Sequence, residues 1–292
     1  IGTNGFENFV RHRLMPAAAT LKASINVASG GLAGAGYMED VSPELYDVRA
    51  MEYLFERYRD YIYGLKLRIG KDISEGKGLR PLEESVRLAR MFHTRLSLHA
   101  TYPLEPLPEI AARMGEGDVL CHTFQAMGPY SILNEAGQVY PEVWEARRRG
   151  VLFDSAQGRV HCSFSVARAA IEQGFCPDVI STDLITFSAY QERLFSLPVV
   201  MSRFLALGMP LAEVVRCCTQ TPAGLMGLAG QIGTLRPGAL ADVAVMKMEE
   251  RRFEFQDSYG DCLPASRMLL PRMTLKAGRT VWRDIAFTGM MR

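Results

Sequence analysis

The chain alternates short apolar runs with amphipathic segments, and this alternation constrains its fold more than any other feature. The runs are too short for helices and are rich in valine, isoleucine and leucine. They cover Ala23–Ala28, Ile62–Ile69, Leu96–Ala100, Asp118–Phe124, Val151–Asp154 and Val179–Leu184. Helical patterns follow at Pro43–Arg57, Pro81–Phe92, Tyr140–Arg149, Val166–Glu172 and Pro198–Ala206. Strands that alternate with helices at intervals of roughly 30–40 residues predict parallel βαβ units.

Two parallel architectures are compatible with this alternation, an open doubly wound sheet and a closed barrel. A dinucleotide-binding sheet carries a G-x-G-x-x-G turn after its first strand. The glycine-rich segment Gly30–Gly34 follows a predicted strand but does not open a helix. Polar residues instead stand at the carboxyl ends of several strands, where barrel enzymes hold their chemistry. We therefore predict a TIM-type (β/α)-barrel of the α/β class.

The composition fits a globular enzyme and argues against several other classes. The length of 292 residues suits one large barrel or two ordinary domains. The 33 lysines and arginines nearly balance 32 acidic residues, which gives no reason to expect nucleic acid or a membrane as a partner. No apolar run is long enough to span a bilayer, and the first residues do not resemble a signal peptide. Six cysteines without a C-x-x-C pair predict reduced thiols in a cytoplasmic protein.

The composition changes near residue 227. A turn-rich segment, Gly233–Gly238, precedes two predicted strands, Ala241–Met248 and Met273–Arg283, the second with a turn at Lys276–Gly278. We predict a barrel domain over residues 1–227 and a small β-rich segment, part of a β-sandwich, over residues 228–292.

Two histidines end consecutive predicted strands. His99 lies in Leu96–Ala100, where a buried imidazole must be hydrogen-bonded or ligated, and His122 repeats the arrangement on the next strand. Side chains at the ends of neighbouring barrel strands lie close enough to share one ion, and zinc prefers imidazole and carboxylate ligands with a position open for water. The pair therefore indicates a metal site.

Two further residues join this pattern. Asp183 ends the last predicted strand, where it could cap a helix or form a salt bridge, or could bind the ion and take a proton from its water. Lys66 stands inside an apolar strand, where burial of an ammonium is costly. It could pair with an acid, extend out of the barrel, or be carbamylated by carbon dioxide to a carboxylate that bridges two ions.

The order strand-Lys, strand-His, strand-His, strand-Asp resembles the amidohydrolase superfamily of metal-dependent hydrolases. Local strings are similar to its deacetylase/dihydroorotase-like branch. They are Gly64–Arg68, Gly117–His122, Arg149–Asp154, Pro177–Asp183, Ser202–Leu205, Thr219–Ala223 and Gly233–Asp242. The match is collinear over nearly the whole chain.

The resemblance implies a role for each matched residue. Lys66 would be the carbamylated bridging ligand, His99 and His122 would bind the second ion, and Asp183 would bind the first ion and act as general base. A metal-bound hydroxide would attack the substrate. Arg68, Tyr102 and Gln157 lie near strand ends and could contact substrate.

The chain departs from the family at its amino-terminal end. The family's first strand carries a His-x-His pair, and none of the five histidines forms one. Ile1–Phe6 resembles the turn after the family's second strand, so we expect six of eight barrel strands in this chain, with the other two in a separate chain, in an amino-terminal segment not included here, or absent. His12 and His93 are predicted on the surface, and His161 in a loop at the barrel mouth.

Two loops differ from the family in a way that affects the substrate. Histidine-containing loops are expected after His122 and after Asp154, but this chain has Phe124–Ala126 and Ser155–Gly158, each with a glutamine. Glutamine cannot shuttle protons as histidine does, which indicates a different substrate from that of close relatives.

The predicted function is metal-dependent hydrolysis of an amide, cyclic amide or acyl ester bond in a small molecule, with zinc as the cofactor, one or two ions. The alternative is a catalytically inactive or truncated amidohydrolase-fold protein that serves as a binding or assembly subunit. A metal-free isomerase or lyase accounts poorly for two histidines and an aspartate at strand ends. An exposed barrel edge also predicts a homo-oligomer.

Overall fold

The computed structural model describes residues 1–32, 39–189 and 196–287. The chain divides into two compact units, Ile1–Asp154 and Ser155–Arg292. This division follows the density of contacts, whereas the predicted boundary near residue 227 follows composition, and that boundary stays a prediction.

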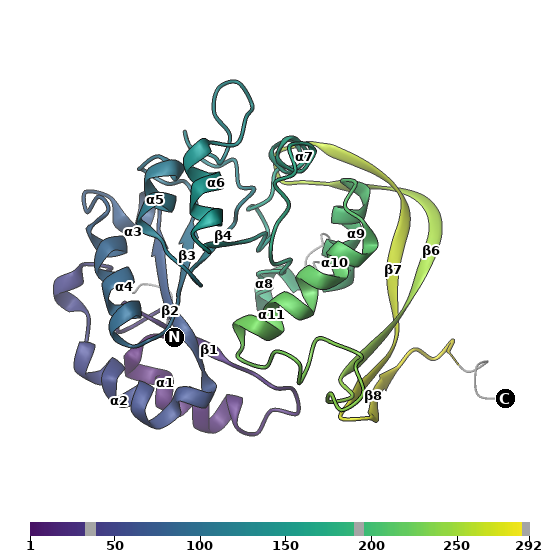
Figure 1. Ribbon diagram of the computed structural model, residues 1–292, viewed down its shortest axis with the longest axis horizontal. Helices are drawn as coiled ribbons and strands as arrows, with labels where there is room; N and C mark the ends of the chain where they lie inside the picture. Colours follow the sequence, from purple (N-terminus) through teal and green to yellow (C-terminus); the bar gives the residue numbers. More distant parts are fainter. Residues whose placement is uncertain (33–38, 190–195, 288–292) are drawn as a thin grey trace. The chain divides into compact units, whose positions relative to one another are not determined.

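The first unit is a parallel α/β layer (Figure 1). Its strands are β1 (Ala23–Asn26), β2 (Ile62–Ile69), β3 (Leu96–Ala100), β4 (Val119–Cys121) and β5 (Leu152–Asp154). Its α-helices are α1 (Thr3–Phe9), α2 (Val48–Tyr58), α3 (Lys71–Ser74), α4 (Arg80–Met91), α5 (Leu107–Arg113) and α6 (Pro141–Arg148). It also contains a π-helix, η1 (Val10–Leu14), and two 3-10 helices, η2 (Pro43–Leu45) and η3 (Arg59–Tyr61). The strands pair in sequence order, and every pair is parallel.

The two faces of this sheet differ in polarity. Leu65 and Leu67 of β2 and Leu98 of β3 are fully buried, and helix α4 lies against both strands. Burial of each leucine contributes about 1.5–3 kcal/mol, so this face anchors the layer.

The other face carries the polar side chains. Lys66 and Arg68 lie opposite Ser97 and His99, His99 lies opposite Cys121, and Cys121 lies opposite Asp154. Residues in register on parallel strands project to the same side of a sheet. We call this set the polar face: Lys66, Arg68, Ser97, His99, Cys121 and Asp154.

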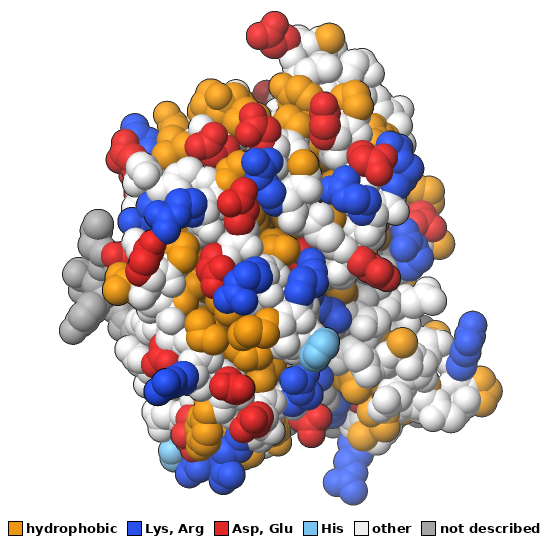
Figure 2. Space-filling model, turned by 60° about the vertical axis from the view of Figure 1, so that its left-hand side comes forward, with side chains coloured by type: hydrophobic (Ala, Val, Ile, Leu, Met, Phe, Trp, Pro, Cys, Tyr) orange, Lys and Arg blue, Asp and Glu red, His pale blue; other side chains and the backbone are white. Residues whose placement is uncertain are grey.

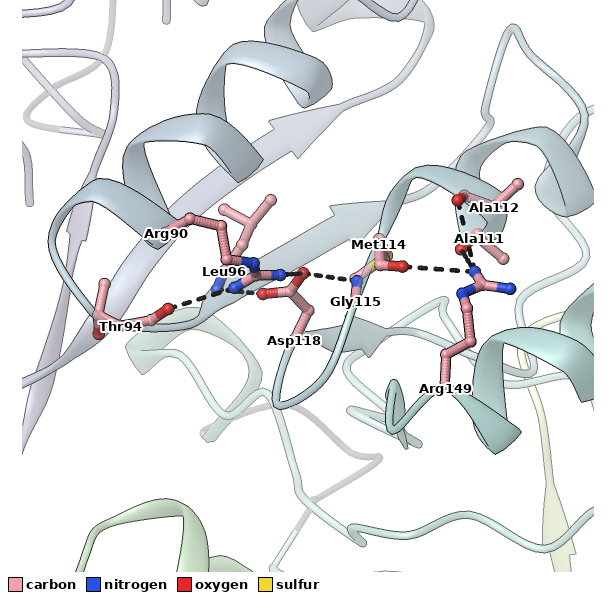
Figure 3. Close-up of polar contacts among 9 residues, drawn as sticks. All are labelled: Arg90, Thr94, Leu96, Ala111, Ala112, Met114, Gly115, Asp118 and Arg149. Atoms are coloured by element: carbon pink, nitrogen blue, oxygen red, sulfur yellow. Dashed lines mark hydrogen bonds and ion pairs between the residues drawn. The ribbon is translucent and has the colours of Figure 1, made fainter.

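The opposite, amino-terminal ends of β3 and β4 are held by the buried carboxylate of Asp118 (Figure 3). It accepts hydrogen bonds from the backbone N–H of Leu96 at 2.8 Å and of Gly115 at 3.0 Å, and it pairs with Arg90. Beside it, the Arg149 guanidinium donates to backbone carbonyls at the end of α5, the nearest being that of Ala111 at 3.0 Å. These contacts hold the amino-terminal ends of β3 and β4 in place.

The second unit combines helices with an antiparallel sheet. Its helices are α7 (Phe164–Glu172), α8 (Thr186–Ala189), α9 (Leu197–Ala206), α10 (Leu211–Cys218) and α11 (Gln220–Leu225), and its strands are β6 (Val243–Gln256), β7 (Cys262–Lys276) and β8 (Arg279–Arg283). Helix α9 packs on β7, where the Ser202 hydroxyl accepts a hydrogen bond from the Leu269 N–H at 2.9 Å. The first predicted carboxyl-terminal strand is present as β6 and extends well beyond its predicted end at Met248. The second, Met273–Arg283, corresponds to the end of β7 and to β8 on either side of the predicted turn, and β7 begins eleven residues earlier, at Cys262.

The prediction of a sixth regular strand, Val179–Leu184, is wrong. Apart from a bridge at Val179, the segment has no strand assignment. Its carbonyls accept hydrogen bonds from Ser155, Gln157 and Gly158, but the reciprocal backbone bonds are replaced. The Ile180 N–H bonds to the Cys217 carbonyl, and the Ser181 N–H bonds to the Ser155 hydroxyl. The segment is therefore extended and fixed by hydrogen bonds, but it lacks the regular backbone hydrogen-bond pattern of a β-strand.

None of the helices in the described part of the chain is long and apolar enough to cross a membrane. On the face shown in Figure 2, lysine and arginine side chains are interspersed with aspartate and glutamate, and neither sign of charge gathers into a patch.

Candidate functional site

The two predicted imidazole ligands are neighbours within the first unit. The rings of His99 and His122 lie edge to face, with centroids 4.4 Å apart and planes at 80°. His122 is 3% exposed and has a left-handed backbone, with φ of +60°. Histidine is one of the few residues that tolerate this conformation, which ends strand β4 and often marks functional sites. The donors suit zinc or a similar ion, because two imidazoles side by side can share one metal.

Lys66 lies in the middle of the polar face. Its ammonium donates to the Cys121 thiol sulfur at 3.5 Å, and the Ser97 hydroxyl lies 3.3 Å from the same sulfur. Burial raises the pKa of the Cys121 thiol, and the nearby positive charge of Lys66 opposes this only in part. The thiol therefore remains protonated at neutral pH.

Arg68 is held by a buried carboxylate at the end of β1 and β2. Its guanidinium donates to Glu39 Oε2 at 2.7 Å, and the Asn26 amide donates to Glu39 Oε1 at 2.6 Å. The Glu39 side chain is 6% exposed. The charge of Arg68 is thus largely neutralised, and its contact with substrate stays a prediction.

Tyr102 has a fixed ring just beyond β3. The Lys71 ammonium lies 5.3 Å from its centroid, and Gly128 lies so close that a Cβ there would come within 2.9 Å of the ring. Tyr102 also has a positive φ, of +49°. Its predicted contact with substrate is untested.

Asp183 and Gln157 belong to the second unit. Asp183 has φ of +48°, a conformation that aspartate tolerates better than most residues, and its side chain is 42% exposed. Gln157 is 1% exposed, and its amide oxygen accepts a hydrogen bond from Arg203 at 2.9 Å. This burial favours a role for Gln157 in holding its loop, and its contact with substrate stays a prediction.

Comparison with known proteins identifies the family. A model of the amidohydrolase family matches residues 81–278. The chain belongs to the amidohydrolase family. This confirms the predicted family and the predicted class of enzyme, a hydrolase.

Curated relatives narrow the similarity within the family. A deacetylase of Brucella anthropi is 28% identical over 276 residues, which are 93% of this chain and 67% of the relative. A deacetylase of Agrobacterium fabrum is 29% identical over 276 residues, which are 93% of this chain and 66% of the relative. The chain thus spans about two thirds of the length of these relatives.

Solved structures agree on the fold. A dihydroorotase matches with a TM-score of 0.87 and 26% identity, over 97% of this chain and 74% of that protein. An adenine deaminase matches with a TM-score of 0.87 and 24% identity, over 97% of this chain and 76% of that protein. The predicted TIM-type α/β fold with a carboxyl-terminal β element is confirmed.

The sequence analysis assigned no metal-binding or catalytic role to two side chains of the second unit, His161 and Arg203, which lie near Asp183 and Gln157 respectively. His161 was expected only to line the barrel mouth, yet its Nε2 lies 3.8 Å from Asp183 Oδ2. Arg203 is 6% exposed and lies near the rings of Phe164 and Phe255. Two signals were available for it, its position inside the apolar run Val200–Leu205 and its place in the family-like string Ser202–Leu205.

Proposed function

We propose that this amidohydrolase-family chain takes part in metal-dependent hydrolysis of an amide, cyclic amide or acyl ester bond in a small molecule. The adjacent imidazoles of His99 and His122, at the carboxyl end of a parallel sheet, are the observation that carries this proposal. The relatives that are named deacetylases, and the solved dihydroorotase, favour this substrate class.

The proposed ligands are Lys66, His99, His122 and Asp183, and the proposed ion is zinc. When bound, such an ion supplies Lewis-acid activation of a water and of the scissile carbonyl. The chain's own residues would then bind the ion, accept a proton and orient the substrate. The imidazoles of His99 and His122 would hold the ion, and an Asp183 carboxylate oxygen would accept the proton of the attacking water. Arg68 and Tyr102 would orient the substrate.

Removal of metal tests this proposal. The purified protein should contain about one or two equivalents of a divalent metal by elemental analysis, as structural precedent for such sites suggests. Dialysis against a chelator should abolish hydrolysis of a panel of N-acetyl amino acids, cyclic amides and acyl esters, and zinc should restore it. Chelator already saturated with zinc is the control. Undiminished hydrolysis by metal-free protein would refute the proposal.

A second candidate function is binding or assembly without catalysis. A binding or assembly subunit of the same fold would show no turnover on any substrate of the panel, with or without added zinc. A cytoplasmic location and a homo-oligomeric state stay predictions.

A further inference from the structure

The loop after β5 places the imidazole of His161 beside Asp183. Residues 155–158 run parallel to residues 179–182, with backbone bonds from Gln157 N to Ser181 O at 3.2 Å and from Gly158 N to Thr182 O at 2.9 Å. The chain then turns back, and the backbone N–H of His161 donates to the backbone carbonyl of Gln157 at 3.1 Å. This turn brings His161 Nε2 to 3.8 Å from Asp183 Oδ2.

Gly158 leaves room for both side chains. A Cβ at this position would lie 2.6 Å from His161 Cδ2 and 2.8 Å from Asp183 Oδ2, and its φ is +50°. Real Cβ atoms do not approach other atoms so closely. The absence of a side chain at Gly158 is therefore what allows the imidazole and the carboxylate to converge.

The separation of the two donors suits a shared ion. Zinc binds imidazole nitrogen at about 2.0–2.1 Å and carboxylate oxygen at about 2.0–2.2 Å, so two donors to one ion lie about 3.4 Å apart at the tetrahedral angle and no more than about 4.3 Å apart on opposite sides of the ion. At 3.8 Å, His161 Nε2 and Asp183 Oδ2 fall inside this limit and beyond ordinary hydrogen-bond length.

Hydrogen bonds from neighbouring residues also hold the loop of residues 155–161 rigidly, as a metal site requires. Arg203 of α9 donates to the Gln157 amide oxygen at 2.9 Å, and the Gln157 amide donates to the Cys162 sulfur at 3.4 Å. The Tyr259 hydroxyl donates to the Val160 carbonyl at 2.8 Å. These contacts fix both sides of the turn that carries His161.

We propose that His161 is a metal ligand that binds the same divalent ion as Asp183. The inference rests on the proposed function, because it takes Asp183 as a ligand. It assigns to a loop of this chain an imidazole donor that the sequence motifs did not predict. The ion is a zinc-type cation that accepts mixed nitrogen and oxygen donors.

Metal affinity of the His161→Ala and His161→Gln variants tests the assignment. Loss of a supporting residue around a metal usually costs 10- to 100-fold in affinity, so loss of a direct ligand should weaken binding of one zinc ion by at least about 100-fold. Zinc affinity would be measured by competition with a chromophoric chelator, and X-ray absorption of the zinc-loaded protein would count bound imidazoles. His12→Ala is the matched control, since His12 lies exposed on η1.

The outcomes separate the two proposals. Weaker binding together with one imidazole fewer supports the ligand role of His161. Unchanged affinity, or a smaller loss with the imidazole count intact, overturns it while leaving the proposed function standing. Wild-type protein that binds no zinc would overturn the proposed function itself. Thermal unfolding of each metal-free variant checks that it folds.

A change that keeps both donors gives a second test. Gly158→Ala should weaken zinc binding by at least about 10-fold, because the new Cβ displaces His161 and Asp183 from each other. Gly174→Ala is the matched control, since Gly174 also has a positive φ, of +84°, but has open space where a Cβ would lie. Equal zinc affinity in the two variants would contradict the proposed convergence of donors at Gly158.

Discussion

Replacing Asp183 by asparagine should lower kcat by about 10²- to 10⁴-fold, the usual contribution of a general base. Asparagine keeps the size of the side chain and tolerates the left-handed backbone at this position, where φ is +48°. The amide cannot accept the proton of the attacking water and is a poorer metal ligand than a carboxylate. The chemistry should therefore be lost while the fold is kept.

The experiment needs steady-state kinetics with a substrate found in the hydrolysis panel, and far-UV circular dichroism of both proteins. Asp60→Asn provides the matched control, because Asp60 lies exposed on η3 in the first unit. It should keep the wild-type kcat. An Asp183→Asn enzyme with a kcat within about threefold of wild type would exclude Asp183 as the base, since loss of a base costs far more.

Replacing Asp118 by alanine should lower the free energy of unfolding by about 3 kcal/mol, because two backbone N–H donors lose their acceptor at about 1–3 kcal/mol each. The Asp118 side chain is fully buried, whereas its partner Arg90 is 42% exposed and can be rehydrated. The main penalty is the loss of the acceptor for the Leu96 N–H at the start of β3 and for the Gly115 N–H in the turn before β4. Figure 3 shows how these donors converge on one carboxylate.

Urea unfolding followed by circular dichroism measures this loss. Asp118→Asn keeps one carbonyl acceptor and should lose about 1–2 kcal/mol, the typical cost of one buried group left unsatisfied. Glu116→Ala, an exposed acid in the same turn, should change stability by less than about 0.5 kcal/mol. If Asp118→Ala were as stable as Glu116→Ala, the carboxylate would not be what holds the strand ends.

The layer of strands and helices could be predicted because its signals are local. Strands β2 and β3 begin and end where the apolar runs do, and α4 and α9 lie within one residue of their predicted bounds. Strand β4 is shorter than predicted, since Asp118 turns its carboxylate to backbone donors and His122 adopts a left-handed conformation. Such events depend on partners distant in sequence, which an apolar run does not reveal.

The charged stretch Glu249–Arg252 is the opposite case, in which a strand is longer than the sequence predicts. It has no apolar alternation and was not predicted as strand, yet it lies inside β6. Glu249 and Glu250 pair with Met268 and Arg267 of β7, and the register shifts between Glu250 and Phe253 before the pairing resumes. Tertiary pairing here overrides the local preference of the sequence.

The sequence by itself determined that Lys66, His99 and His122 stand in or at the ends of strands, since each apolar run sets the position of its own polar residue. The sheet register then decided which of these side chains share a face, and it added Ser97, Cys121 and Asp154 to them. Only the tertiary structure brought His161 to Asp183, because that approach depends on two extended segments lying side by side and on the missing side chain of Gly158. The sequence supplies the imidazole of His161 and the carboxylate of Asp183, but tertiary packing sets the distance between them.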